Sequence, residues 1–194
     1  MSRYLDIATT PSVAAAQDKY GSAEQWARIA ARGGVDETTP GQRLGPAEAG
    51  FIGERDGFYL ASVSETGWPY VQYRGGPAGF LTVLEPALLG FGDFRGNRQY
   101  ITTGNVTAND RVSLFLMDYA HRQRLKIFGR IRIIDAADDP SLAERLTMPD
   151  YSARVERLVL IGVEAFDWNC PQHITPRFTL AELQRWRQTP GAAP

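Results

Sequence analysis

The sequence holds one cysteine, two histidines and almost no net charge, and each shortage excludes a class of protein. Cys170 has no partner for an internal disulfide, which is typical of a reducing cytoplasm. A zinc site would have to add carboxylates to Cys170, His121 and His173, so we predict no metal site. The net charge of -1 argues against general nucleic-acid binding, because that activity needs a basic surface.

Several motifs that mark large classes of protein are also missing. No apolar run reaches the roughly 18 residues that span a membrane, so we predict no membrane contact. The first six residues carry no apolar signal-peptide core, and we therefore predict a cytoplasmic protein. There is no Walker motif, and the glycine-rich run at residues 75–79 does not lie between a strand and a helix. A dinucleotide fingerprint requires that context, so a Rossmann sheet is disfavoured.

The composition is that of an ordinary globular chain, with 43% hydrophobic and 22% charged residues. We predict a single domain over residues 1–194, with N-terminal helices at about 11–55 and a C-terminal helix at about 179–188. The helix starts carry capping signals at four positions: Thr10, Ser22, Pro46 and Thr179. An apolar stripe on the second helix is predicted to be buried: Trp26, Ile29 and Ala30.

The middle of the chain is rich in strand patterns. Six strands are predicted, at residues 58–64, 68–74, 87–93, 111–118, 124–134 and 157–163. Gly67 occupies the left-handed position of a three-residue hairpin loop between the first two. Residues 111–118 are apolar on both faces and therefore predict a central, buried strand. This mainly β pattern with peripheral helices predicts an antiparallel barrel or sandwich.

Two segments, residues 68–77 and 92–100, combine glycines with three arginines, two glutamines and an asparagine. Guanidinium forks match phosphate oxygens, and glycines let backbone N–H groups approach an anion. The two segments suit a flat, polar-edged ligand with a phosphate, although a solvated hairpin with a polar rim fits them as well. Asn97 and Arg98 stand where a helix is predicted to begin, at about residue 98. They can attract a phosphate there, and Asn97 can equally be a simple N-cap.

Two further segments leave alternatives open. On the strand at 124–134, Arg124 and Lys126 either face solvent or point towards an anionic ligand. The loop after Trp168 is either a packed structural loop or one that lays Gln172 and His173 over the edge of a bound ring. A nucleophilic Cys170 with His173 as its base lacks a third, orienting residue.

Together these segments resemble the pyridoxamine 5'-phosphate oxidase-like family of FMN-binding split β-barrels, in its predicted flavin-nucleotide-binding branch. The likeness runs from about residue 13 to residue 177. It is carried by nine motifs: Phe51-Ile-Gly-Glu-Arg55, the run at 67–77, Gly79-Phe-Leu81, the run at 93–101, Gly104-Asn105, Asn109-Asp-Arg111, Met117-Asp-Tyr119, Arg124-Leu-Lys-Ile127 with Gly129, and the run at 167–174. The resemblance implies an antiparallel split barrel that binds FMN.

The resemblance also implies particular cofactor contacts. The strand at 70–74 should follow the ring and the ribityl chain, and the turn at 96–99 should hold the phosphate. Arg124 matches a position that is Gln in the true oxidases. The family builds its sites at a homodimer interface, where the second chain would supply Gln172 and His173. The implied cofactor-binding residues are Gln72, Tyr73, Arg74, Asp93, Asn97, Arg98, Gln99, Arg124, Gln172 and His173.

The tail departs from the oxidases, which end in an Arg/His-rich segment and a Trp that meets the flavin. We therefore expect an FMN-dependent oxidoreductase that reduces a small molecule or free flavin with NAD(P)H, and not a true pyridoxamine phosphate oxidase. His173 is the best candidate for a proton donor. The alternatives are a flavin-binding module without turnover, or the same barrel carrying haem or a deazaflavin.

Overall fold

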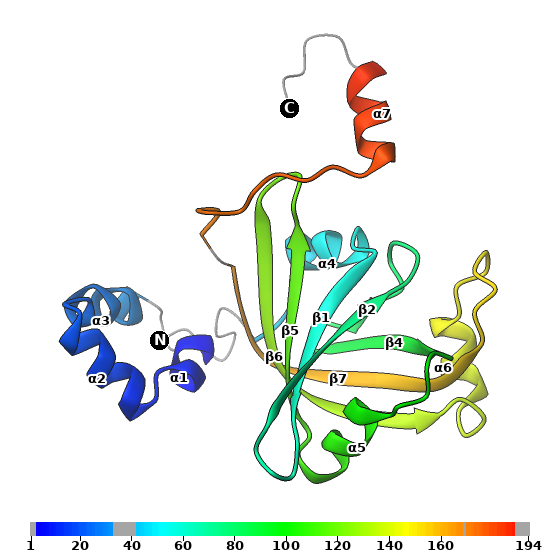
Figure 1. The fold of residues 1–194 in the computed structure, drawn as a ribbon, viewed down its shortest axis with the longest axis horizontal. Coiled ribbons are helices and arrows are strands. Elements are labelled where there is room, and N and C mark those ends of the chain that lie inside the picture. Colours follow the sequence, from blue (N-terminus) through cyan, green and yellow to red (C-terminus); the bar gives the residue numbers. More distant parts are fainter. Residues whose placement is uncertain (1–2, 33–41, 169, 189–194) are drawn as a thin grey trace.

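The computed structural model describes residues 3–32, 42–168 and 170–188, and its centre is one antiparallel sheet (Figure 1). The strand order is β2-β1-β5-β6-β7-β4-β3. The sheet curls, but it does not close, because β2 and β3 are its two edges and do not pair with each other. The predicted antiparallel split barrel is confirmed. The strands are β1 Gly57–Val63, β2 Pro69–Gly75, β3 Thr82–Glu85, β4 Leu88–Phe94, β5 Arg111–Asp118, β6 Gln123–Asp135 and β7 Val155–Trp168.

All six predicted strands are present, and β3 and the second half of β7 were not predicted. Strand β6 pairs with β5 on one side and with β7 on the other, with a register shift between Phe128 and Gly129. A Cβ atom at Gly129 would lie 2.6 Å from a methyl of Ile161 and 2.8 Å from the carbonyl oxygen of Gly162. Only glycine fits this crossing of the two long strands.

The core fills the inside of the curled sheet, where alternate residues of each strand are buried: Leu60, Leu114, Leu116, Leu125, Ile127 and Ile161. Strand β5 is central, as predicted, because it pairs with both β1 and β6. The prediction that both of its faces are buried is wrong for the single chain. Phe115 and Met117 are only half-buried, because nothing in the described chain fully covers the outer face of this strand.

The helices are α1 Arg3–Ala8, α2 Pro11–Lys19, α3 Ala23–Arg32, α4 Pro46–Gly53, α5 Ile101–Ala108, α6 Pro140–Leu146 and α7 Leu180–Gln188. The predicted starts at Thr10, Ser22, Pro46 and Thr179 agree with α2, α3, α4 and α7, whereas α1 and α6 were not predicted. In α2 the Thr10 hydroxyl accepts a hydrogen bond from the amide of Val13, as a capping residue should.

The N-terminal helices form an arm at the side of the barrel (Figure 1). Helix α1 is attached to the barrel by Tyr4, whose ring stacks on Phe128 at 4.6 Å between centroids. The stripe predicted to be buried on α3 is exposed at Trp26 (38%) and Ile29 (41%), while the side chain of Ala30 lies outside the described part. No described helix is long and apolar enough to cross a membrane.

Candidate functional site

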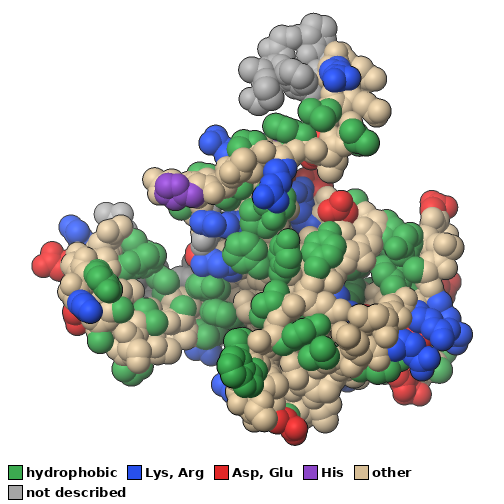
Figure 2. Space-filling view, in the orientation of Figure 1, with side chains coloured by type: hydrophobic (Ala, Val, Ile, Leu, Met, Phe, Trp, Pro, Cys, Tyr) green, Lys and Arg blue, Asp and Glu red, His purple; other side chains and the backbone are tan. Residues whose placement is uncertain are grey.

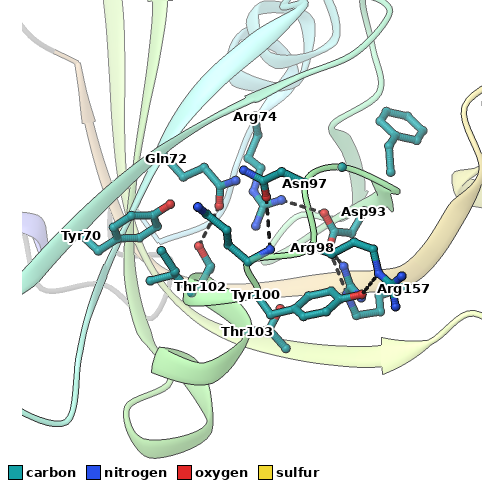
Figure 3. A pocket seen from close by; sticks show the side chains of 14 residues that line it. Tyr70, Gln72, Arg74, Asp93, Asn97, Arg98, Tyr100, Thr102, Thr103 and Arg157 are labelled. Atoms are coloured by element: carbon teal, nitrogen blue, oxygen red, sulfur yellow. Dashed lines mark hydrogen bonds and ion pairs between the residues drawn. The ribbon is translucent and has the colours of Figure 1, made fainter.

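A cavity of about 220 Å³ lies between β2, the end of β4 and the loop that leads into α5 (Figure 3). Strand β2 contributes every second residue, because alternate side chains of a strand point to the same face. Fourteen residues line the cavity: Tyr70, Gln72, Arg74, Asp93, Phe94, Gly96, Asn97, Arg98, Gln99, Tyr100, Ile101, Thr102, Thr103 and Arg157.

Asp93 is the buried charge at the back of this cavity, only 4% exposed. Arg74 Nη1 donates to its Oδ1 atom at 2.7 Å. Arg157 donates to its Oδ2 atom through Nε at 3.0 Å and through Nη2 at 2.7 Å. These short distances are typical of charge-assisted hydrogen bonds. Burial opposes the charging of Arg157, but the hydrogen bond and the charge of Asp93 outweigh it, so the pKa of Arg157 is raised.

The loop before α5 has an unusual backbone, with φ of 63° at Arg98 and 56° at Tyr100. Asn97 Oδ1 accepts from the amide of Gln99 at 3.2 Å, which makes a local turn. Helix α5 begins at Ile101, and Tyr100 occupies its N-cap position. The predicted helix start at residue 98, with Asn97 as the cap, is therefore wrong, because the Asn97 side chain is used by the turn.

Tyr100 closes one side of the cavity. Its hydroxyl accepts from Arg98 Nε at 3.1 Å, and the guanidinium of Arg157 lies 4.7 Å from its ring centroid. The hydrogen bond from Arg98 lowers the pKa of the Tyr100 hydroxyl, and Arg157 lowers it further. The phenol therefore orients two arginines, one by a hydrogen bond and the other by a cation–π contact.

Gln72 lies beside the N-terminus of α5. The Thr102 hydroxyl donates to its Oε1 atom at 3.0 Å, so the amide nitrogen is the end of Gln72 that a ligand can use. One turn further along α5, Asn105 Nδ2 donates to the Ser62 hydroxyl at 3.0 Å in a buried hydrogen bond. These two contacts hold α5 against β1 and β2 and keep that side of the cavity in place.

The site has more donors than the described chain can satisfy. Arg74 Nε is buried and has no hydrogen-bond partner among the described residues. An unpaired buried donor costs about 1–3 kcal/mol, so such groups usually meet a ligand, an ion or a water. Arg74 and Arg157 flank the carboxylate of Asp93, and Arg98 lines the same cavity, which is therefore cationic. Its donors suit an anion with several oxygens.

Not all of the predicted residues line this cavity. Six do: Gln72, Arg74, Asp93, Asn97, Arg98 and Gln99. Tyr73 lies on the opposite face of β2, 56% exposed, with its ring 5.5 Å from that of Tyr59. Arg124 lies on the outer face of β6, where its Nη2 atom donates to the carbonyl oxygen of Cys170 at 3.1 Å and its buried Nε atom has no partner among the described residues. Gln172 and His173 are exposed on the turn that follows β7.

Sequence reasoning missed Arg157 and Tyr100. Tyr100 ends the segment at 92–100 and follows the turn predicted to hold the phosphate, but no role was predicted for it. Arg157 lies opposite Asp93 in the pairing of β4 with β7, 64 positions along the chain. Only that register could have indicated it.

A second buried carboxylate, Asp118, ends β5 away from this cavity. Arg55 Nη1 lies 3.0 Å from its Oδ2 atom, and His121 Nδ1 lies 2.9 Å from the same atom. The amide of His121 donates to Oδ1 at 2.9 Å. Burial opposes ionisation, but the two hydrogen bonds from His121 and the charge of Arg55 outweigh it, so the pKa of Asp118 is lowered.

Comparison with known structures supports the fold. The chain is similar to a putative pyridoxamine 5'-phosphate oxidase from Lactobacillus delbrueckii, with a TM-score of 0.51 and 19% identity over 66% of this chain and 96% of that one. It is also similar to HupZ from Group A Streptococcus, with a TM-score of 0.51 and 12% identity over 70% of this chain and 99% of that one. At these identities the likeness shows the fold alone.

The search of curated proteins gave no match. The family model described as pyridoxamine 5'-phosphate oxidase matches residues 44–170, the part that contains all seven strands and every residue lining the cavity. The chain therefore belongs to the pyridoxamine 5'-phosphate oxidase family.

Proposed function

We propose that this protein binds FMN in the cavity between β2, β4 and the loop before α5, and that it acts as an oxidoreductase. The observation that carries the proposal is a cavity lined by Arg74, Arg98 and Arg157, in which Arg74 also has a buried Nε without a partner among the described residues. Family membership and the resemblance of residues 67–77 and 93–101 to FMN split barrels point to the same ligand.

The residues fit the two ends of FMN differently. Arg74 and Arg98 suit the phosphate, because their guanidinium groups supply several donors to its oxygens. Gln72 has its amide oxygen fixed by Thr102, so its NH₂ group suits the polar edge of the ring system. When bound, FMN would supply the hydride or electron transfer that no side chain can perform. The role of the chain is then to bind the cofactor, orient it and limit its contact with water.

We further propose a homodimer. Aromatic and aliphatic side chains on the outer face of β1 and β2 are exposed at Tyr59 (39%), Val71 (60%) and Tyr73 (56%). Figure 2 shows hydrophobic side chains gathered on the face where these strands lie in front, and Phe115 of β5 is half-buried beside them. A patch of this kind on a soluble protein marks an interaction surface. A second copy would cover it and bring the partner's Arg124, Gln172 and His173 towards the cavity.

The substrate is proposed to be a small molecule or free flavin, reduced at the expense of NAD(P)H. The tail at 169–178 reads Asn-Cys-Pro-Gln-His-Ile-Thr-Pro-Arg-Phe and differs from the Arg/His-rich segment that binds pyridoxal phosphate in true oxidases. We therefore propose a different substrate from pyridoxamine phosphate.

The cofactor is tested by the absorption spectrum of the purified protein and by the mass of whatever denaturation releases. We expect a flavin spectrum and FMN. Recovery of FAD, haem or a deazaflavin, or no flavin after reconstitution with FMN, contradicts the proposal. Turnover is then tested by the oxidation of NADH or NADPH in the presence of small electrophiles or free flavin. A protein that binds FMN but oxidises neither NADH nor NADPH is a binding module.

The dimer is tested by light scattering and by mixing two variants, Arg98→Ala and the double variant Gln172→Ala/His173→Ala. If each site uses both chains, a mixed dimer has one site with both lesions and one intact site. Random 1:1 mixing makes about half of the dimers mixed, so it should restore tight FMN binding to about a quarter of all sites. A fully loaded monomer at micromolar concentration contradicts the dimer, and a mixture no better than its components contradicts shared sites.

A further inference from the structure

We propose that Arg157 of β7 is a phosphate-binding residue and that Asp93 is the positioning residue that sets Arg157 and Arg74 at the spacing a phosphate requires. Neither role follows from the sequence, which places Asp93 itself among the cofactor contacts and omits Arg157. The inference rests on the proposed function only in taking a phosphate-bearing cofactor as the ligand.

Asp93 is poorly suited to touch a phosphate. The residue is only 4% exposed, and both carboxylate oxygens are occupied, Oδ1 by Arg74 and Oδ2 by two donors of Arg157. A carboxylate and a phosphate repel each other at contact distance, and that repulsion is strong where water is excluded. What Asp93 does in this geometry is hold two guanidinium groups on either side of one point.

Arg157 keeps donors for a ligand after it has paired with Asp93. It spends Nε and one hydrogen of Nη2 on the carboxylate, and Nη1 reaches Glu156 only at the limiting distance of 3.5 Å. Its guanidinium lies over the Tyr100 ring at 4.7 Å, which limits how that plane can turn. A group held by a carboxylate on one side and by a ring on another is pre-organised, so it loses little entropy when a ligand binds.

Arg74 is held in the complementary way. Only its Nη1 atom is spent on Asp93, at 2.7 Å, while its buried Nε atom stays without a partner in the described chain. The two arginines therefore converge on Asp93 from β2 and from β7, and both line the same cavity (Figure 3). A phosphate monoester offers three terminal oxygens, enough to meet donors from Arg74, Arg98 and Arg157 together.

The charges of the cavity agree with this assignment. Three arginines and one carboxylate leave a net charge of two positive units, which matches the dianion that a phosphate monoester carries above its second pKa of about 6. Asp93 also reduces the cost of keeping three guanidinium groups close together when no ligand is bound. A buried cation is expensive unless it is paired.

The positioning role of Asp93 makes a prediction with a distinctive sign. If Asp93 acted only through its charge, Asp93→Asn would add a positive unit to the cavity and tighten FMN binding. If it positions Arg74 and Arg157, the same variant should weaken FMN binding, because an amide holds guanidinium groups poorly. The two accounts therefore predict opposite signs for one measurement.

The experiment measures the Kd of FMN and of riboflavin by flavin fluorescence for the wild type and four variants: Asp93→Asn, Arg157→Gln, Arg157→Lys and Arg132→Gln. Arg132 is exposed on β6 outside the cavity, so Arg132→Gln controls for the loss of one positive charge. Circular dichroism and Tm identify any variant that fails to fold. Arg157→Lys keeps the charge and should fold even if Arg157→Gln does not.

We expect Arg157→Gln to weaken FMN binding by about 10- to 100-fold with little change for riboflavin, which has no phosphate. Arg157→Lys should recover part of the loss, Arg132→Gln should match the wild type, and Asp93→Asn should weaken FMN binding about 10-fold or more. Equal losses for FMN and riboflavin, or none for either, overturn the role of Arg157. Unchanged or tighter FMN binding by Asp93→Asn overturns the positioning role.

The inference and the proposed function can fail separately. If the wild type binds no flavin, titration with inorganic phosphate followed by ³¹P NMR tests the phosphate site directly, with Arg157→Gln against Arg132→Gln as the comparison. Phosphate binding that Arg157→Gln abolishes then supports the inference while the FMN proposal falls. Flavin binding that tolerates Arg157→Gln leaves the proposed function intact and removes the inference.

Discussion

Two buried aspartates of this barrel look alike and differ in what surrounds them. The Asp93 and Asp118 side chains are 5% and 6% exposed, and each is paired with half-buried arginine. Asp93 lies near the end of β4 with Arg74 and Arg157, whereas Asp118 ends β5 with Arg55 and His121. From burial and charge alone, the two would be equally good candidates for a functional site.

The two sites differ in whether the N–H donors of the paired arginine all have partners. Arg55 donates through Nε to the carbonyl oxygen of Phe51 at 3.1 Å, and its guanidinium lies 4.7 Å from the Phe51 ring centroid. Its Nη1 atom pairs with Asp118, and its Nη2 atom pairs with Glu54 at 3.1 Å. Arg74 keeps a buried Nε without a partner in the described chain, and it lines a cavity. The saturated ion pair ties the segment after α4 to β5, whereas the unsaturated one belongs to a residue that lines a cavity. The useful signal is an unpaired donor on a residue that lines a cavity, not the buried pair.

The sharpest way to break this comparison is Asp118→Ala. Removing Asp118 leaves Arg55 with only the exposed Glu54 as a charge partner among the described residues, so we expect the free energy of unfolding to fall by about 3 kcal/mol, the low end for a broken buried ion pair. The FMN affinity of the folded fraction should stay the same. Urea denaturation gives the first quantity and flavin fluorescence the second. A loss below about 1 kcal/mol, or an FMN affinity that falls with it, would show that the two aspartates are not separable in this way.

Arg98→Ala tests whether the cavity that contains Asp93 binds the phosphate. Arg98 points at the site from an exposed loop and bonds Tyr100, so we expect its removal to weaken FMN binding about 10-fold or more and to leave riboflavin binding almost unchanged. Arg95→Ala is the matched control, because Arg95 is in the same segment, is paired with Glu156 at 3.5 Å and does not line the cavity. Equal losses for both ligands would place Arg98 away from the phosphate.

The comparison also shows how far sequence alone could reach. Strand-like apolar patterns predicted β1, β2, β4, β5 and β6, and the alternation in β6 matches its buried face. Gln72, Arg74, Asp93 and Arg98 were assigned through the family resemblance of two segments, and they do line one cavity. What could not be predicted depends on contacts between distant elements. Arg157 acquires its role only through the register of β7 against β4, where it pairs with Asp93.

Local patterns misled where tertiary context decides. The stripe at Trp26 and Ile29 predicts burial, yet α3 lies in an arm beside the barrel and both side chains are exposed. Asn97 suits an N-cap, but its side chain is used in a turn and α5 begins four residues later. In both cases the residue type was interpreted correctly and the partner it would meet was not. A pattern identifies what a residue can do, and only the fold selects among the possibilities.

The pH dependence of stability also tests the ion pair of Asp118, with a smaller expected effect than the two substitutions above. The pKa of Asp118 is lowered in the folded protein, so the stability it contributes is present above the unfolded pKa of about 3.9 and is lost as the pH falls through the folded value. We expect the difference in unfolding free energy between the wild type and Asp118→Asn to be constant above about pH 5 and to narrow below that. Urea denaturation across this range measures it. If the difference in unfolding free energy instead grows as the pH falls, the pKa of Asp118 is not lowered in the folded protein.

The smallest expected effect concerns His173, which sits exposed on the turn after β7 with φ of 62°. Asn tolerates that backbone about as well as His does, so His173→Asn should preserve the turn, and His173→Gln keeps hydrogen bonding while removing the titratable ring. Because the side chain is exposed, neither variant should change the free energy of unfolding by more than about 0.5 kcal/mol.

If the partner's His173 passes a proton to a substrate above the flavin, both variants should slow turnover a few-fold and remove one limb of the pH–rate profile. The base of the turn is held by Arg124 on the carbonyl oxygen of Cys170, so Arg124→Ala should move the same turn and reproduce part of that loss while keeping the pH limb. An unchanged rate and flavin spectrum, together with a fall in stability, would make His173 a structural residue of the turn and leave the proton donor to the substrate or to water.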